Sequence, residues 1–467
     1  MSYNPSYCWI LGWALGPFFT QRHRDPQRVP KTITQLYSYY IYNTLKNHGR
    51  EIESPRDVLL RYTFLHLTIQ EFVAALAQFL TPDRRDILKL LTEAHSTTDG
   101  RFEVFLRFVA GISFPGAARG LEEFLGPFPH QTICRVIDWV KEEVKRQSGN
   151  TESLTGKRSL LNTLYYLFES QNRGLAQAAL GAVETLSFSG LRLTPIDCAV
   201  LSHVIGLCDT IKHLDLWDCF IRCEGLQRLG PGLHKCMVLG LGLNDLGDSG
   251  VKLVSASLRD PECKIQKLWL RGVGLTDSGA EDLASALSTN RSLTELDLSY
   301  NNMGDSGVNL VSAALRDPEC KLQTLRLGWN RLTDSGAQGL ASALRTNRSL
   351  KELDLSGSKL ADSGVKLVSA ALRDRECKIQ RLRLGVNRLT DSGAKVLVSA
   401  LSANRSLMEL DLGSNSVTDG SVPALRRLML TLPSLEQIRL EGNRFSPTGE
   451  KELRSLQEPR SRLRVNV

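Results

Sequence analysis

The stretch LTELDLSYNNMGDSGVNLVSAALRDPEC (293–320) holds one complete unit of the pattern that decides the fold of this chain. Its first part, LDL (296–298), alternates apolar and polar residues with a period of two, as a short half-buried strand does. Its second part places Val308, Val311 and Leu315 at a helical spacing, so that they share one face. One unit therefore predicts a strand followed by a helix.

The unit recurs along the chain in the form LxxLxLxx(N/C)xL, a pattern typical of leucine-rich repeats. Its third apolar position falls at Phe188, Leu216, Leu241, Leu270, Leu298, Leu327, Leu355, Leu384, Leu412 and Leu440. The successive intervals are 28, 25, 29, 28, 29, 28, 29, 28 and 28 residues. A strand and a helix in each period predict a curved α/β solenoid of about ten repeats over 181–467, with parallel strands on its concave side.

Two kinds of polar residue recur with the leucines. The Asn position of the template is expected to hydrogen-bond backbone groups of the turn, and it holds Asn244, Asn301, Asn330, Asn387, Asn415 and Asn443. Six Asp-Ser-Gly triplets are expected to supply N-cap oxygens to their helices, at 248–250, 277–279, 305–307, 334–336, 362–364 and 391–393. Two unit types alternate, entered through DPECK (260–264) or TNRSL (289–293), and this alternation is similar to ribonuclease-inhibitor-type leucine-rich repeats.

The residues between the strand leucines are expected to face the concave surface. One such position reads Asp297, Arg326, Asp354, Arg383, Asp411 and Arg439 on successive strands, which lie about 4.8 Å apart in a sheet. This alternation is either a charged docking surface or a set of cross-strand pairs that neutralise one another. Trp217, Trp269 and Trp329 lie on or beside the same face, and tryptophan next to an arginine such as Arg271 is typical of protein interfaces. Acids as numerous as bases favour a protein partner over nucleic acid.

Composition narrows the class of protein. Of 467 residues, 42% are hydrophobic and 23% are charged, with a net charge of +8, as in ordinary soluble globular proteins. The ten cysteines show neither CxxC nor zinc-ligand spacing, which indicates a reducing, cytoplasmic location. The apolar stretch 7–19 is too short to span a bilayer and no basic residue precedes it, so neither a membrane span nor a signal peptide is expected.

The first 180 residues lack the repeat and predict an all-α domain, with helices over 58–80, 88–92, 102–109, 131–145 and 159–169. The segments YTFLHLTIQEFVAAL (62–76) and LLNTLYYLFESQN (160–172) resemble the second helical domain of NACHT–leucine-rich-repeat proteins, the NLR family. YNPSYCWI (3–10) and KTITQLYSYY (31–40) resemble the winged-helix region of that family, and the NACHT, LRR and PYD subfamily is the nearest. The resemblance implies a partial winged-helix segment (1–60), a NACHT-associated helical domain (61–180) and the repeat domain (181–467).

The resemblance also carries two positions that contact nucleotide in the family. Pro5 matches a proline that contacts adenine, and His66 matches a histidine near the phosphates. The sequence contains neither GxxxxGK[ST] nor an acidic Walker B strand, so we expect no ATP hydrolysis and no bound cofactor. ATP or ADP belongs to full-length relatives with a P-loop. No GxSxG, HExxH or paired-cysteine motif is present either, so neither catalysis nor a metal site is expected.

The family resemblance implies a non-catalytic module of an NLR-type innate-immune receptor. Its repeats would sense or scaffold a protein partner, other NLR chains included, and modulate inflammasome-type signalling. Because the sequence starts within winged-helix-like residues, we expect a part of a larger protein or a decoy without a death-fold domain. A stand-alone enzyme inhibitor of the ribonuclease-inhibitor type is the alternative, and an NTPase is the third hypothesis.

Overall fold

A computed structural model describes residues 30–48, 67–80, 87–97, 99–374, 376–457, 460 and 462–467. These residues form two compact units. Unit 1 comprises the described residues up to Glu184 together with His203–Asp209, and unit 2 comprises Thr185–Ser202 and Thr210–Val467. The predicted boundaries 1–60, 61–180 and 181–467 stay predictions.

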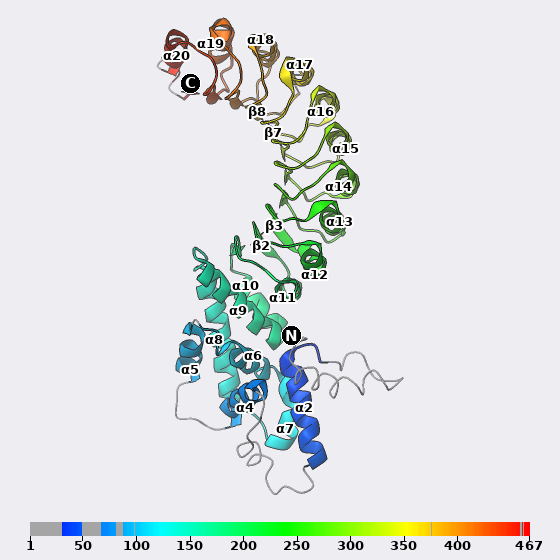
Figure 1. Cartoon of the computed structure of the whole chain (residues 1–467), viewed down its shortest axis with the longest axis vertical. Helices are drawn as coiled ribbons and strands as arrows, with labels where there is room; N and C mark the ends of the chain where they lie inside the picture. Colours follow the sequence, from blue (N-terminus) through cyan, green and yellow to red (C-terminus); the bar gives the residue numbers. More distant parts are fainter. Residues whose placement is uncertain are drawn as a thin grey trace. The chain divides into compact units, whose positions relative to one another are not determined.

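Unit 1 is built from α-helices in its described residues (Figure 1). They are α2 (Ile33–His48), α4 (Leu67–Leu80), α5 (Ile87–Ser96), α6 (Glu103–Ile112), α7 (Pro115–Leu125), α8 (His130–Ser148), α9 (Leu154–Ser170) and α10 (Arg173–Leu180). Helix α6 packs against α4 and α9, and nearly all of its apolar residues are buried. At the centre the ring of Phe108 lies 5.1 Å from Phe72 and 5.3 Å from Tyr37, so three helices share one aromatic core.

The expected helices of unit 1 are present wherever the structure describes them, but the sequence reading also missed some. Helices α2, α7 and α10 were not predicted, and the helix expected over 159–169 starts earlier in the structure. Helix α9 already begins at Leu154, because the Ser153 side chain accepts a hydrogen bond from the backbone N–H of Gly156 at 3.0 Å and caps the helix.

Unit 2 is the predicted solenoid, so the α/β fold class is confirmed. Its eleven strands pair in parallel in sequence order: β1 (Leu186–Ser187), β2 (Ile211–Asp215), β3 (Cys236–Gly240), β4 (Lys267–Trp269), β5 (Glu295–Asp297), β6 (Thr324–Arg326), β7 (Glu352–Asp354), β8 (Arg381–Arg383), β9 (Glu409–Asp411), β10 (Gln437–Arg439) and β11 (Arg464–Asn466). Leu296 of β5 and Leu298 just after it, for example, are fully buried.

Helices cover the outer side of this curved sheet, and the strands line its inner side (Figure 1). They are α11 (Pro195–Leu207), which the two units share, α12 (Cys223–Leu233), α13 (Gly247–Leu258), α14 (Asp277–Thr289), α15 (Asp305–Leu315), α16 (Asp334–Thr346), α17 (Ala361–Leu372), α18 (Asp391–Leu401), α19 (Val422–Thr431) and α20 (Pro447–Arg454). Two 3-10 helices complete the unit, η2 (Asp419–Ser421) and η3 (Ser455–Gln457).

The strand β11 was not among the ten predicted units. Val465 pairs in register with Ile438 of β10, so it occupies the position of a strand leucine. Val467 stands two residues further, where the template has its next leucine. Valine fits a half-buried strand as well as leucine does, but a template written for leucine does not detect it.

The asparagine prediction is confirmed. The Asn301 side chain is buried and donates to the carbonyls of Leu270 and Leu298, at 2.8 and 2.9 Å. Its oxygen accepts from the N–H groups of Val273 and Leu275, at 3.1 and 3.0 Å. One amide thus satisfies backbone groups of its own turn and of the turn before it. The same arrangement recurs at Asn244 and Asn415.

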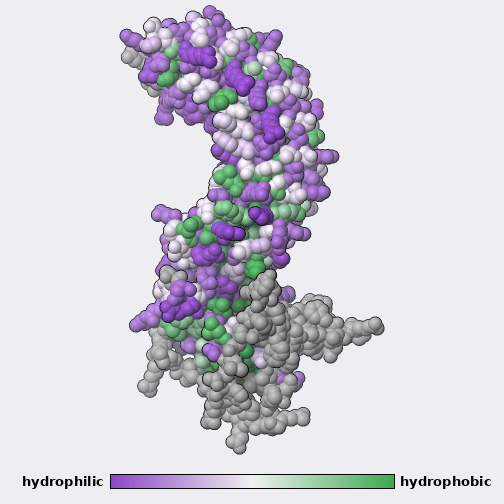
Figure 2. Space-filling view, viewed as in Figure 1, coloured by the Kyte–Doolittle hydropathy of each residue, from purple (hydrophilic) through white to green (hydrophobic). Residues whose placement is uncertain are grey.

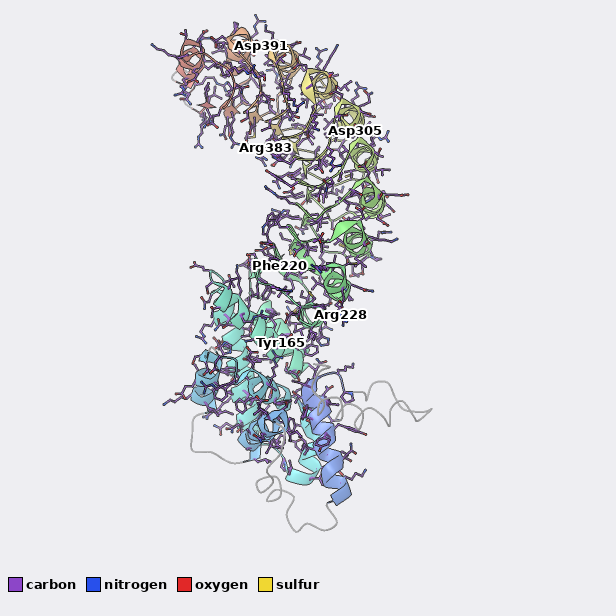
Figure 3. All side chains as sticks on the ribbon, viewed as in Figure 1. Tyr165, Phe220, Arg228, Asp305, Arg383 and Asp391 are labelled. Atoms are coloured by element: carbon purple, nitrogen blue, oxygen red, sulfur yellow. The ribbon has the colours of Figure 1, made fainter. Side chains whose placement is uncertain are left out.

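The expected role of the Asp-Ser-Gly triplets is corrected by the structure. These aspartates bind the helix start of the next unit rather than capping their own helix. Asp305 accepts from the N–H and the hydroxyl of Thr333, at 2.8 and 2.5 Å. Asp277 accepts from the N–H groups of Gly304 and Gly307, at 2.7 and 3.0 Å. In Figure 3, Asp305 and Asp391 lie on the helical side of unit 2.

The glycine of the triplet has a steric reason. A Cβ atom on Gly307 would lie 2.6 Å from Oδ1 of Asp277, closer than real contacts allow. The glycine therefore makes room for the aspartate of the preceding unit. In the units that hold both residues, asparagine and aspartate couple neighbouring units at the two ends of the strand–helix connection.

Among the described residues, no single helix is both long enough and apolar enough to cross a membrane. Helices α6 and α7 meet those criteria only when joined, and they are bent by 81° where they meet.

Asn301→Ala is expected to lower the free energy of unfolding by about 2–4 kcal/mol, because it leaves several buried backbone groups without partners. Urea denaturation of the whole chain measures the change. Asn302→Ala is the matched control, since Asn302 is exposed, and it should change stability by less than about 0.5 kcal/mol. Equal effects of the two substitutions would contradict the role of the buried amide.

Gly307→Ala is expected to destabilise by about 1–3 kcal/mol, because the new methyl group displaces Asp277. Gly206→Ala is the control, since Gly206 lies inside α11 with no atom within 4 Å of a built Cβ. That substitution should stabilise by about 0.5–1 kcal/mol. Thermal unfolding of both variants tests the pair, and a stabilised Gly307→Ala protein would refute the steric account.

Candidate functional site

The six charged residues of the predicted concave row occupy equivalent strand positions. Asp297 pairs in register with Arg326, and Arg326 with Asp354. Asp354 pairs with Arg383 and Arg383 with Asp411. Arg439 of β10 continues the row beside Asp411. The row is therefore continuous from β5 to β10, and Arg383 lies on the strand side of unit 2 in Figure 3.

The arginines of the row find their partners in a different position from the predicted one. Arg326 pairs with Glu295 at 2.6 Å and with Glu352 at 3.1 Å. Arg383 pairs with Glu352 at 2.8 Å, and Arg439 pairs with Glu409 at 3.1 Å. The glutamates stand two residues before the aspartates of the row, so the pairs run diagonally between strands.

The aspartates of the row bind their own backbone instead. Asp297 and Asp354 each accept from the N–H two residues on, at 2.9 Å, and Asp411 does the same. Asp411 is the one aspartate of the row with a recorded ion pair to a row arginine, at 3.6 Å from Arg439. The expectation that neighbouring members of the row neutralise one another is therefore wrong for most of the row.

Glu352 lies at the centre of this network. Its side chain is 4% exposed, and it also accepts from Nε of Arg381 at 2.8 Å. Burial alone would raise the pKa of Glu352, but the hydrogen bond from Arg381 and the charges of Arg326 and Arg383 outweigh burial and lower it. The pKa of Glu295 is lowered in the same way, against burial, mainly by Arg326. Three guanidinium groups are thus fixed in place around one carboxylate.

Two of the predicted tryptophans flank β3. Trp269 lies on β4, and its indole N–H donates to Glu295 at 3.1 Å. A Cβ on Gly240 would lie 3.3 Å from the Trp269 ring, and one on Gly242 would clash with the Trp217 ring. Gly240, the last residue of β3, and Gly242, two residues further along the chain, therefore leave room for both rings. Figure 2 shows hydrophobic side chains on the inner edge of unit 2 near β3.

Trp329 is connected to Arg271 through Tyr300, a residue that was not predicted to take part in the site. The rings of Tyr300 and Trp329 stack at 5.3 Å with an interplanar angle of 20°. The guanidinium of Arg271 lies 4.2 Å from the centre of the Tyr300 ring. Arg271, Tyr300 and Trp329 therefore form one continuous surface across three turns.

The missed glutamates left a signal in the sequence. The tripeptide ELD occurs at 295–297, 352–354 and 409–411, with a spacing of 57 residues. This repetition places a glutamate beside each aspartate of the row.

Pro5 and His66 lie outside the described residues. Within the described part of the chain, no three His, Cys, Asp or Glu side chains are arranged to hold a metal ion.

Two family models match the chain. The model described as NLRC4 helical domain HD2 matches residues 66–178. The Leucine Rich repeat model matches residues 289–311, 320–341, 346–369 and 403–425. Among curated proteins, NACHT, LRR and PYD domains-containing protein 12 of Homo sapiens is 32% identical over 397 residues, which cover 77% of this chain. The chain belongs to the NLR family.

Other similarities of this NLR-family chain extend over both parts or over the repeats. NACHT, LRR and PYD domains-containing protein 3 of Bos taurus is 28% identical and covers 86% of the chain. The ribonuclease inhibitor of Sus scrofa is 36% identical and covers 49% of it. Among solved structures, the yeast Rad7–Elc1 complex matches with a TM-score of 0.46 and 15% identity, covering 82% of this chain and 98% of that one.

The chain spans about half or less of the curated relatives that it matches. The coverage is 37% of human protein 12, 50% of bovine protein 3 and 52% of the pig inhibitor. The matched family is a leucine-rich-repeat, protein-interaction type and not a known enzyme class.

Glu352→Gln is expected to cost about 1–3 kcal/mol at neutral pH, because three arginines lose a buried anionic partner. The folded-state pKa of Glu352 lies below its usual value of 4.5, so its contribution is present above that pH and is lost as the pH falls through the lowered pKa. The variant should therefore show a shallower loss of stability on acidification. Denaturation between pH 7 and pH 3 measures both effects.

Glu319→Gln is the control for this change, since Glu319 is exposed in a loop of unit 2. It should leave stability and its pH dependence within error of the parent chain. An acid limb that is the same in the Glu352→Gln variant and the parent would mean that Glu352 does not hold the network.

Proposed function

We propose that this chain is a non-catalytic protein-interaction module of an NLR-type innate-immune receptor. Unit 2 senses or scaffolds a protein partner, and this binding modulates inflammasome-type signalling. The observation that carries the proposal is the similarity to human NACHT, LRR and PYD domains-containing protein 12, which extends over 77% of the chain. We also propose that the module works in the cytoplasm and without a bound nucleotide or metal.

The ion-pair network supports a binding role for the strand side of unit 2. Arg326 and Arg383 are held by Glu352, so their side chains are ordered before any partner arrives. Binding then costs less conformational entropy than ordering free arginines would. Because these arginines already have anionic partners, they serve to fix orientation and selectivity more than to attract charge over a distance.

The same network favours a protein over a nucleic acid as the partner. The carboxylates of β5, β7 and β9 alternate with the arginines of β6, β8 and β10 along the sheet. A phosphate backbone tracking along the row would meet repeated like charge. A folded protein with interspersed charges can match such a surface.

Similarity to the ribonuclease inhibitor of Sus scrofa supports the alternative, a stand-alone inhibitor that caps an enzyme. That similarity covers 49% of the chain, whereas human protein 12 covers 77%. The NLR-type function accounts for more of the sequence and is therefore the first choice.

Co-precipitation of the whole chain with full-length human NACHT, LRR and PYD domains-containing protein 12 tests the proposal. We expect association, and we expect the charge reversals Arg326→Glu and Arg383→Glu together to weaken it by at least tenfold, since both disrupt the ordered row. Arg345→Glu is the matched control, because Arg345 is exposed on α16 on the helical side.

Inhibition of a pancreatic-type ribonuclease is measured in parallel. Stoichiometric inhibition without association with the NLR protein would establish the alternative and refute the first proposal. If the chain neither associates with the NLR protein nor inhibits the ribonuclease, both proposals are refuted.

A further inference from the structure

The turns after the strands of unit 2 share one backbone feature. In the nine turns after β2 to β10, the residue before the asparagine position has a positive φ, between 52° and 69°. These residues are Asp218, Leu243, Gly272, Tyr300, Trp329, Gly357, Val386, Ser414 and Gly442. Glycine adopts this left-handed conformation without strain, whereas other residues pay about 1 kcal/mol.

Four of these nine turns carry a large apolar side chain at the strained position. Leu243, Tyr300, Trp329 and Val386 are 47%, 45%, 45% and 40% exposed. Neither burial nor backbone preference explains such residues there, since the other turns use Gly, Asp or Ser. A non-glycine residue that adopts a strained left-handed backbone without a gain in stability indicates a functional position.

The rings of Tyr300 and Trp329 are held in place by contacts with neighbouring turns. Trp329 stacks on Tyr300, and a Cβ on Gly357 would lie 2.5 Å from the Trp329 ring, so the ring rests against the next turn. Arg271 covers Tyr300 from the turn before. We call this set, Arg271, Tyr300 and Trp329, the aromatic platform.

Exposed cations continue from the platform along the same edge. Arg331, Lys359 and Arg388 stand two residues after the left-handed position in three successive turns, and all three are exposed. Within the described part of the chain none of them has a recorded ion-pair partner, unlike the paired arginines of the strands. This edge therefore combines an apolar anchor site with free positive charge.

Given that unit 2 binds a protein as proposed above, we propose that the aromatic platform and these three cations bind an acidic peptide segment that carries an apolar anchor residue. The anchor packs on Tyr300 and Trp329, and carboxylates of the segment pair with the cations. The turns after β5, β6, β7 and β8 follow one another at about 4.8 Å. About five residues of an extended peptide therefore span this edge. Protein hot spots combine aromatic and arginine side chains in this way.

Single-stranded nucleic acid is the other class of ligand that binds to aromatic rings and cations. The adjacent carboxylates of Asp297, Asp354 and Glu352 disfavour it, since they lie on the strands that lead into these turns. The aromatic edge is therefore assigned to a peptide.

The substitutions that test the platform are compatible with the fold. Trp329→Gly and Tyr300→Gly each place glycine where neighbouring turns already have Gly272 and Gly357. The melting temperature should stay within about 3 °C of the parent value, because relief of backbone strain offsets the lost stacking. Ser414→Gly makes the same backbone change in a turn without a large side chain and is the matched control.

The probe is a displayed library of random 12-residue peptides, selected against the immobilised whole chain. We expect enriched peptides to be net negative and to contain Trp, Phe or Leu. The synthetic peptide should lose at least tenfold in affinity with Trp329→Gly and with the Arg331→Glu, Arg388→Glu pair. Ser414→Gly should not change its affinity, and added salt should weaken binding.

Three results would overturn the inference. One is no enrichment, or enrichment of basic peptides. Another is an acidic peptide whose affinity is unchanged by Trp329→Gly. The third is a single-stranded oligonucleotide that binds more tightly than any peptide and loses binding with Trp329→Gly. Association of the same variants with full-length NACHT, LRR and PYD domains-containing protein 12 is measured separately, so that failure at this edge is distinguished from failure of the proposed function.

Discussion

In the turns that are followed by a unit with an asparagine, backbone groups that the sheet leaves unpaired are satisfied by the side chain of that asparagine; these residues are Asn244, Asn301, Asn330, Asn387, Asn415 and Asn443. The buried amide of Asn301, bonded to carbonyls and N–H groups of two turns, is the clearest case. On the helical side, Asp305 bonds the helix start of the next unit. Because a solenoid unit touches only its neighbours, such bonds decide whether the units stack at all. An isolated unit would leave these groups without partners and could not be stable.

The backbone of the same turns determines what unit 2 displays. The residue just before the asparagine position is left-handed in the nine turns after β2 to β10, including the three that hold Cys219, Val273 or Ser358 at that position. Glycine fills that position in Gly272, Gly357 and Gly442. Where Tyr300 and Trp329 fill it instead, the scaffold presents stacked rings at the edge of the sheet. A requirement of the scaffold thus supplies the surface that a partner can use, which explains how interaction surfaces vary on one fold.

The sequence predicts the scaffold well because its signals are local and repeated. The spacing of Leu296, Leu298 and Asn301 is enough for the strand, its buried face and the turn. The ion pairs that the sequence does not predict involve long side chains that extend to neighbouring strands. The long side chains of Arg326 and Arg383 extend diagonally to Glu352, while the short Asp354 bonds its own backbone, so reading one strand position at a time gives the wrong pairs.

The other differences between sequence and structure have physical causes of their own. Asp277 has the right residue type for a helix cap, but its partners, Gly304 and Gly307, belong to the following unit. The aromatic platform leaves no local pattern, since Tyr300 and Trp329 stand where the repeat usually has small residues. Within unit 1, hydrophobic spacing finds the long helices, while the short helix α10 depends on the cap at Asn172.

The central claim is that the strand side and the adjoining turns of unit 2 bind a protein, while the helical side is scaffold. Hydrogen exchange of the whole chain, alone and in complex with full-length human NACHT, LRR and PYD domains-containing protein 12, tests it most directly. Added protection in the turns at 299–302, 328–331 and 385–388, with α14 to α18 unchanged, is the predicted result. Protection confined to those helices, with the turns unchanged, would contradict the claim.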